Sequence, residues 1–205
     1  MTATATRRAA LGALAALAFA PAAGRAQDAL DAKGYAIGDM TLGDPDAPVT
    51  IVEYVSFTCG HCANFHTRTW PEIEERYVDT GQARLVFREV YFDQFGLWAS
   101  MLSRCGGEEA FFPMTDMFLA RQQEWTRAEE PVAEMTRLAR LGGLSQERIQ
   151  ACLTDEAFMT RLVEDYQRNA SADEVNSTPT FLINGEKHTG DMSVEDFAAL
   201  IEKHL

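Results

Sequence analysis

Two cysteines separated by two residues are the part of the chain best suited to chemistry. They lie in the segment Cys59-Gly60-His61-Cys62, where a buried strand is expected to give way to a helix. The first N–H groups of a helix lack partners within it and the helix dipole is positive there. A thiolate at that position is stabilised, so its pKa falls below the ordinary value of about 8.5. We therefore expect Cys59 to form mixed disulfides and Cys62 to resolve them, while His61 adds positive charge or a hydrogen bond.

Glu53 is a further candidate, because it is the one charged residue of an otherwise apolar and hydroxylated strand over residues 49–57. That composition is typical of a central strand in a sheet with both faces covered. A carboxyl group there would lie beneath the dithiol, near the Cys62 sulfur. Burial should raise its pKa, and such a group can pass protons to and from the inner thiol. The alternative is an exposed glutamate at the edge of the sheet.

The segments around the dithiol indicate an α/β fold. Residues 59–78 have helical periodicity, with Pro71 as a kink or restart, and residues 84–92 predict a second strong strand. A strand, a helix and a strand with short links form a βαβ unit, whose strands are parallel. Residues 35–42 could hold a short first strand.

The rest of the chain is mostly helical. Apolar residues repeat at helical spacing over residues 93–172, which predicts an all-helical block without strands. Strand character returns over residues 180–184, and Asn184-Gly185 predicts a tight hairpin turn into an edge strand. A last helix is expected over residues 194–203.

The dithiol, Glu53 and the later segment Thr178-Pro179-Thr180-Phe181 resemble the DsbA-like branch of the thioredoxin superfamily. In such proteins a cis-proline loop lies against the dithiol and holds the substrate chain as an added strand. The resemblance therefore implies a cis bond before Pro179, and it implies that Thr178 and Pro179 bind substrate. The sequence alone gives no reason for a cis bond, which only about 5% of X-Pro bonds adopt.

The resemblance covers nearly all of residues 35–205 and also implies how the chain is organised. We expect a thioredoxin-like fold of the α/β class that is interrupted by an all-helical insertion domain. The thioredoxin-like domain would comprise residues 27–92 and 174–205, and the insertion residues 93–173.

The activity implied by the resemblance is that of an enzyme, a protein thiol-disulfide oxidoreductase that needs no cofactor. A dithiol oxidase that introduces disulfides through a mixed disulfide at Cys59 is the first expectation. The chain departs from its branch at Gly60-His61, since DsbA-type oxidants usually carry Pro-His and Gly-His resembles the eukaryotic protein disulfide isomerases. Thr178 also resembles isomerases and reductases, because valine is usual in DsbA. A disulfide isomerase or reductase therefore stays open, although the short stretch before the first strand leaves no room for a dimerisation domain.

A metal-binding chaperone is the alternative from a different class. The residues that could form its site are Cys59, His61, Cys62 and His66. A structural zinc site requires two well-separated ligand pairs, and the other two cysteines have no cysteine or histidine near them in sequence. We therefore expect no metal. A non-catalytic module with a structural C-x-x-C bridge is also disfavoured, because so small a loop adds little chain-entropy stabilisation.

Cys105 and Cys152 both lie in the helical block, on apolar stretches where each could be a plain buried thiol. In an oxidising compartment two buried cysteines in one small block more often pair. We expect a structural disulfide between them, which would close a loop of about 48 residues and contribute roughly 4 kcal/mol on the chain-entropy model.

Residues 1–26 have the pattern of a secretory signal peptide. Arg7 and Arg8 precede an apolar run, and small residues follow as far as Ala26. The run is shorter than the roughly 20 apolar residues that span a bilayer. The paired arginines also resemble a twin-arginine signal, so the export route, Sec or twin-arginine, stays open, and we expect a periplasmic protein.

The chain is strongly acidic, with a net charge of −13. Such a charge repels phosphate backbones and anionic lipid heads, which argues against nucleic-acid binding. The partners implied by the resemblance are exported proteins with cysteine thiols, and we expect the chain to act on them as a monomer. Recycling of the dithiol by a membrane redox partner or by a reductant stays open.

Overall fold

The structure, a computed structural model, describes Met1 and residues 30–205. The predicted export signal over residues 1–26 lies outside the described residues except for Met1. Among the residues described, no helix is both long and apolar enough to cross a membrane.

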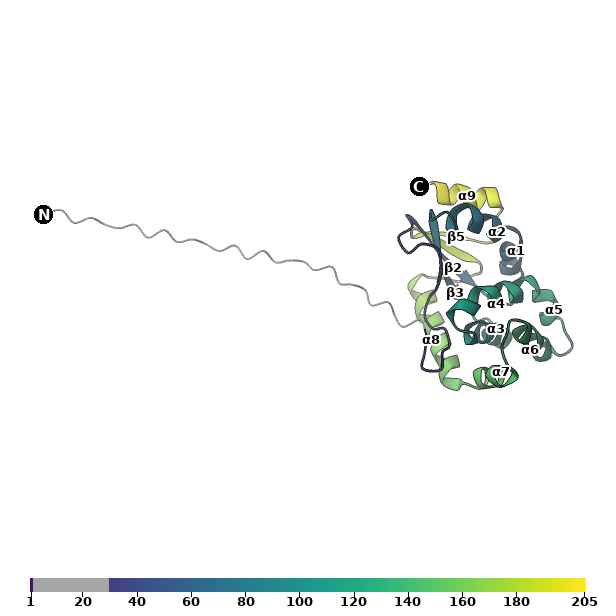
Figure 1. Ribbon diagram of the computed structural model, residues 1–205. Coiled ribbons are helices and arrows are strands. Elements are labelled where there is room, and N and C mark those ends of the chain that lie inside the picture. The colour runs from purple at the N-terminus through teal and green to yellow at the C-terminus, as the bar shows by residue number, and fades with distance from the viewer. Residues whose placement is uncertain (2–29) are drawn as a thin grey trace.

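A mixed five-stranded sheet organises the described chain (Figure 1). Its strands are β1 (Met40–Leu42), β2 (Val49–Val55), β3 (Ala83–Glu89), β4 (Thr180–Ile183) and β5 (Glu186–Thr189). Their order across the sheet is β1-β3-β2-β4-β5. The strands β2 and β3 are parallel, as the βαβ prediction requires, and the other neighbouring pairs are antiparallel.

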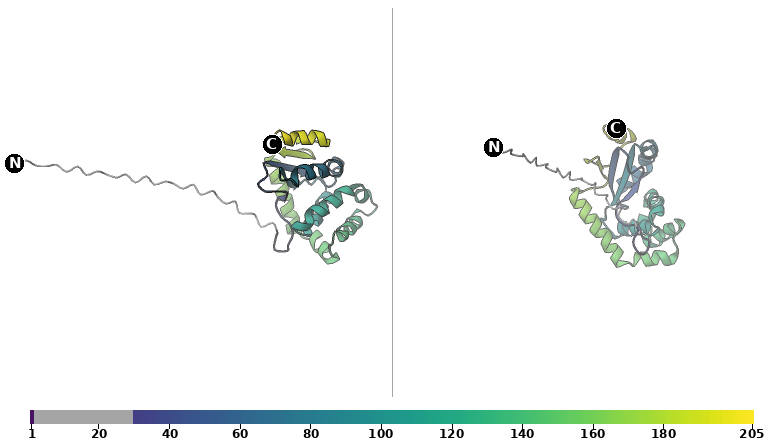
Figure 2. Two further views of the ribbon diagram at one scale, coloured as in Figure 1. Left: turned by 45° about the horizontal axis from the view of Figure 1, so that its top comes forward. Right: turned by 60° about the vertical axis from the view of Figure 1, so that its left-hand side comes forward.

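The helices precede and follow these strands in an order that confirms the α/β class. They are α1 (Gly60–Arg68), α2 (Trp70–Ile73), the π-helical turn η1 (Glu74–Val78), α3 (Gln94–Cys105), α4 (Glu108–Ala120), α5 (Gln122–Thr126), α6 (Pro131–Leu141), α7 (Gln146–Leu153), α8 (Glu156–Ala172) and α9 (Val194–Glu202). Figure 1 shows α3 to α7 gathered below the sheet and α2 and α9 above it, and the right-hand view of Figure 2 shows α8 running from the helical block back towards the sheet.

The strand β2 is central because its side chains find apolar partners on both neighbours. Ile51 pairs with Leu85 of β3 on one side and with Ile183 of β4 on the other, and all three are buried. A strand enclosed in this way leaves no solvent-facing row of side chains, which explains its nearly continuous apolar sequence. Glu53, in the same strand, lies between two phenylalanines of the neighbouring strands.

The helix predicted over residues 59–78 is divided in the structure. The first helix, α1, ends at Arg68, and α2 restarts with Pro71 in its first turn, where the missing N–H of a proline costs no hydrogen bond. The strand predicted over residues 35–42 is shorter than expected, because only residues 40–42 pair with β3.

Aromatic packing fixes the helix that carries the dithiol. The Phe65 ring of α1 lies 4.7 Å from the Phe181 ring of β4 and 5.1 Å from the Phe197 ring of α9, measured between centroids. All three residues are fully buried. The orientation of α1 is therefore coupled to the strand that follows Pro179.

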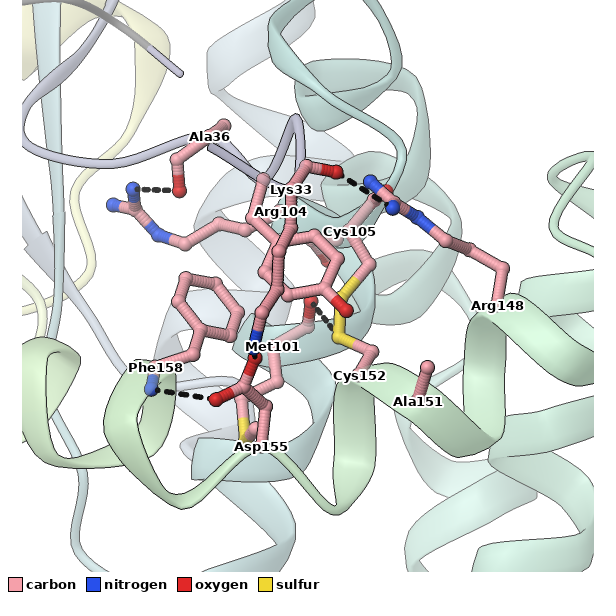
Figure 3. Close-up of a disulfide and its surroundings, with 12 residues drawn as sticks. Lys33, Ala36, Met101, Arg104, Cys105, Arg148, Ala151, Cys152, Asp155 and Phe158 are labelled. Carbon is pink, nitrogen blue, oxygen red and sulfur yellow. Dashed lines mark hydrogen bonds and ion pairs between the residues drawn. A yellow bond between two sulfur atoms is a disulfide. The ribbon is translucent and has the colours of Figure 1, made fainter. Parts of the chain in front are cut away.

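The helical block between β3 and β4 contains a disulfide between Cys105 at the end of α3 and Cys152 of α7, with Cα atoms 6.3 Å apart (Figure 3). Both cysteines are buried. The segment before β1 is hydrogen-bonded to the two bridged helices. The Arg104 side chain of α3 donates to the Ala36 carbonyl, and the Arg148 side chain of α7 donates to the Lys33 carbonyl. The bridge thus joins two helices at the place where the N-terminal segment packs on the block.

Replacing both cysteines, Cys105→Ala with Cys152→Ala, should lower the melting temperature. The sequence separation across the bridge is 47, and releasing such a loop should cost about 4 kcal/mol on the chain-entropy model, on the order of 10 °C in Tm for a domain of this size. Thermal unfolding followed by circular dichroism measures the change. A double variant that melts with the parent protein would contradict a stabilising role for the bridge.

Candidate active site

The dithiol lies at the N-terminus of α1, where Cys59 is the N-cap residue and Gly60 begins the helix. Cys59 has extended backbone angles, and no side chain caps the first N–H groups. Cys59 is partly exposed and Cys62 is completely buried, both as free thiols. The chain therefore presents the outer sulfur at the protein surface and keeps the inner one in the core.

The environment of Cys59 stabilises its thiolate. A hydrogen bond from the Cys62 thiol is the largest cause that lowers the Cys59 pKa, partial burial opposes it, and the Thr178 side chain and the backbone N–H groups of Cys62 and His61 lower it further. Together they lower the pKa of Cys59 to about 5. At neutral pH the outer sulfur is thus a thiolate, which is both the attacking form and a good leaving group.

The pKa of Cys62 is shifted in the opposite direction to that of Cys59. Burial raises the pKa of the Cys62 thiol far above its ordinary range, and the neighbouring Cys59 sulfur raises it further. Cys62 therefore remains protonated in the reduced protein and serves as the hydrogen-bond donor to Cys59.

The cis peptide bond between Thr178 and Pro179 brings a second chain segment to the dithiol. The Cys59 sulfur lies 3.4 Å from the carbonyl oxygen of Thr178. The strand β4 begins directly afterwards, and Thr180 pairs with Tyr54 of β2. Pairing with the strand that leads into α1 thus holds the Thr178-Pro179 loop against the outer cysteine.

Glu53 is fully buried in the sheet, which excludes the alternative of an exposed edge residue. Its two carboxylate oxygens lie 3.1 and 3.2 Å from Nε2 of His66 on α1. From sequence, His66 was considered only as a possible metal ligand, and no local signal indicated its contact with Glu53. His61 is exposed between the two cysteines.

Gln122 is a residue of the site that the sequence analysis missed. Its side-chain amide, at the start of α5, donates hydrogen bonds to the carbonyl oxygens of Phe57 (2.9 Å) and Cys59 (2.8 Å). Gln122 is buried, so these bonds are shielded from water. A single glutamine in a helical block has no local signal that could have identified it.

The residue before the dithiol is bound to the segment that precedes α3. Thr58 donates a hydrogen bond of 2.6 Å to Asp93, the N-cap residue of α3. Phe92 and Phe95, next to Asp93 in the chain, are exposed to 58% and 38%. The segment bound to Thr58, one residue before Cys59, therefore carries exposed large apolar side chains.

No three side chains of histidine, cysteine, aspartate or glutamate are grouped as metal ligands in the part of the chain that the structure describes. The metal site considered from the sequence would use His66 as a ligand, and Nε2 of His66 instead contacts Glu53.

Comparison with known proteins places this geometry in a family. A model of the family described as Thioredoxin matches residues 36–203. The structure of α-DsbA1 from Wolbachia pipientis is 32% identical, with a TM-score of 0.76, and the match covers 82% of this chain and 90% of that one. BdbD from Bacillus subtilis has a TM-score of 0.72 at 22% identity, covers 81% of this chain and 92% of its own, and supports the fold alone.

A relative from Rickettsia bellii, provisionally named a protein-disulfide oxidoreductase, is 33% identical over 168 residues. The match covers 82% of this chain and 64% of that protein. The chain thus spans less than two thirds of the length of this relative.

Alkylation of the reduced protein should show a Cys59 midpoint near pH 5. In a Cys62→Ala variant the midpoint should rise by about one unit or more, because the thiol that donates to Cys59 is absent. The rate of reaction with iodoacetamide as a function of pH measures both midpoints. The Cys105→Ala, Cys152→Ala variant is the control and should keep the low midpoint, whereas a midpoint above about pH 8 in the parent would refute the assignment of Cys59.

The lowered pKa of Cys59 also predicts how the stability of the reduced protein depends on pH. Between about pH 5 and the ordinary thiol value of about 8.5, the unfolded chain holds a proton on Cys59 that the folded chain lacks. The stability of the reduced form should therefore rise with pH across this window. The contribution of Cys59 to that stability should be lost as the pH falls through the Cys59 pKa of the folded protein.

Cys62 is protonated in both the folded and the unfolded state over that window, so it does not mask the effect. Urea unfolding of the reduced and oxidised forms gives the comparison, because the oxidised form has no Cys59 thiol to titrate. A stability difference between the two forms that is independent of pH would contradict the prediction.

Proposed function

Because the chain belongs to the thioredoxin family, and within it to the DsbA-like proteins, we propose that it is a thiol-disulfide oxidoreductase that introduces disulfides into exported proteins. The observation that carries this proposal is the Cys59 sulfur at the start of α1, whose pKa is lowered to about 5. A thiolate stabilised in this way favours the reduced dithiol over the disulfide. The disulfide form is correspondingly a better oxidant.

The oxidase reaction begins with the Cys59–Cys62 disulfide. A substrate thiolate attacks the Cys59 sulfur, the bond to Cys62 breaks, and a mixed disulfide forms at Cys59. A second thiolate of the substrate then attacks its own sulfur in that bond, and Cys59 leaves as the stable thiolate. The substrate gains a disulfide and the enzyme retains the two electrons as a dithiol.

Binding of the substrate chain is assigned to the loop around the cis bond and to the apolar residues near Cys59. Thr178 and Pro179 precede β4 and lie beside the outer sulfur, where an extended chain can pass. The exposed Phe92 and Phe95 suit the apolar side chains of a polypeptide that has not finished folding. Such substrates occur where export and disulfide formation coincide, which agrees with the export signal expected over residues 1–26 and with a periplasmic location.

Isomerase or reductase activity is the second candidate, and the Gly60-His61 dipeptide favours it. Residues between the two sulfurs alter the stability of the thiolate and hence the redox potential. The direction of the reaction therefore depends on a measured potential as well as on the Cys59 pKa.

Equilibration of the protein with glutathione redox buffers tests the proposed direction. An oxidase should have a Cys59/Cys62 potential above that of the glutathione couple, so that the dithiol form predominates in mildly oxidising buffers. The fraction of dithiol is read by alkylation and mass spectrometry. A potential well below the glutathione couple would overturn the oxidase assignment in favour of a reductase.

Two further readouts complete the test. A Cys62→Ala variant should accumulate a mixed disulfide with a disulfide-bonded peptide, because the Cys59 thiolate displaces one peptide sulfur and the resolving thiol is absent, whereas a Cys59→Ala variant should accumulate none. Reduction of insulin and refolding of scrambled ribonuclease separate reductase from isomerase activity. The Cys105→Ala, Cys152→Ala variant should behave as the parent protein in the trapping experiment.

A further inference from the structure

His66 is a buried ionisable residue that the dithiol reaction, as described so far, leaves unused. Its side chain is 4% exposed, and its ring lies 5.7 Å from the Phe87 ring and 6.1 Å from the Trp70 ring between centroids. Nε2 contacts both carboxylate oxygens of the fully buried Glu53. Burying two charges costs free energy that their attraction often only balances, so stability alone is a weak reason for this pair.

The second ring nitrogen of His66 is free. Nδ1 is buried and has no hydrogen-bond partner among residues 30–205. A protonated imidazole carries a proton on each nitrogen, and the one on Nε2 is engaged by Glu53. The proton on Nδ1 is therefore the one available for transfer, and a buried N–H without a partner is unfavourable.

Acidic side chains on three elements favour the protonated form of this imidazole. Burial by itself lowers the pKa of His66, but the charge of Glu53 in β2 and its hydrogen bond outweigh that effect, and Asp116 of α4 and Glu74 of η1 add to it. The net pKa of His66 is raised. These surroundings thus favour the protonated ring in a part of the core closed to solvent.

Cys62 lies one helical turn before His66 on α1. Residues four positions apart on a helix share a face, with Cβ atoms about 5–6 Å apart, and both residues are buried. When a thiolate opens the Cys59–Cys62 disulfide, Cys62 leaves with a negative charge. Burial strongly disfavours that charge, so the leaving sulfur requires a proton inside the core.

We propose that His66 supplies this proton, an inference that rests on the oxidoreductase function proposed above. The substrate sulfur bonds to the Cys59 sulfur, the Cys59–Cys62 bond breaks, and its electron pair goes to the Cys62 sulfur. That sulfur takes the Nδ1 proton of His66, directly or through one water molecule. The products are a neutral Cys62 thiol, a mixed disulfide at Cys59 and a neutral imidazole that still donates from Nε2 to the Glu53 carboxylate.

Resolution of a mixed disulfide by Cys62 runs the same step in reverse. The Cys62 thiol returns its proton to Nδ1 of His66 while its sulfur bonds to Cys59 and the partner leaves. Glu53 is then a positioning residue, which fixes the ring and its tautomer. This assignment differs from the expectation from sequence that the carboxyl of Glu53 itself carries the proton.

The test is the rate at which dithiothreitol reduces the Cys59–Cys62 disulfide, divided by the concentration of dithiothreitol thiolate, from about pH 5 to 9. In the parent protein this corrected rate should fall as pH rises through the pKa of His66, because the proton donor is lost. In a His66→Gln variant it should be about a hundredfold or more lower at neutral pH and nearly independent of pH. A His204→Gln variant, far from the dithiol in sequence, should retain the parent profile.

His66→Gln removes one partner of a buried ion pair, which is strongly destabilising because it leaves the other charge uncompensated. Two measurements keep the test decisive. A Glu53→Gln, His66→Gln double variant removes both charges, and it should show the same low, pH-independent rate. A ¹⁵N titration of the histidine rings in the oxidised parent protein should find His66 protonated on both nitrogens at pH 7.

Equal corrected reduction rates in the parent protein and in the folded variants would overturn the proposal. A ¹⁵N titration that finds the His66 ring neutral at about pH 6, below the ordinary histidine pKa, would also overturn it. Failure of the proposed oxidoreductase function would give a different experimental result. In that case the parent protein itself would not exchange with dithiothreitol at Cys59, whatever the state of His66.

Discussion

The site depends on the position at which α1 begins, because the helix starts between the two cysteines. Cys59 precedes the first turn of α1, where backbone N–H groups point at its sulfur, and Cys62 lies within that turn, sealed in the core. The same helix therefore makes one thiol acidic and the other weakly acidic. The difference gives each cysteine a separate role, since the outer one exists as a nucleophile and leaving group and the inner one as a proton-bearing partner.

Packing from three parts of the chain holds this arrangement. Phe65 joins α1 to β4 and α9, which fixes the helix relative to the cis-proline loop. From the other side Gln122 binds the carbonyls of the turn before α1. The helical block is therefore part of the active-site construction, because it contributes a buried amide that no residue of the βαβ unit provides.

Two buried ion pairs in the same fold differ in a way that bears on function. Arg104 binds Glu89 through Nε and an Nη atom at 2.6 Å each, Ser100 donates to the same carboxylate, and a further Arg104 nitrogen binds a carbonyl oxygen. These groups hold several partners at once, as expected of a structural pair. In the pair formed by His66 and Glu53, one ring nitrogen has no partner among residues 30–205, and His66 lies one helical turn after Cys62 on α1.

Local patterns in the sequence determined the elements and the candidate nucleophile. The C-x-x-C spacing identifies the dithiol, and the change from strand to helix periodicity places it at a helix start. Asn184-Gly185 predicts the β4–β5 turn, and the structure has both residues at positive φ, a conformation that these two residue types tolerate. These features could be read in advance because each depends on residues within one or two turns of one another.

Tertiary structure alone decided what surrounds the dithiol. Gln122 reaches Cys59 from 63 residues away, and His66 meets Glu53 only because α1 packs on β2. Burial, which sets the acidity of Cys62 and the charge on His66, is likewise a property of the packed chain. Periodicity and spacing describe one segment at a time, whereas hydrogen-bond partners and electrostatic environments arise when segments distant in sequence exclude water together.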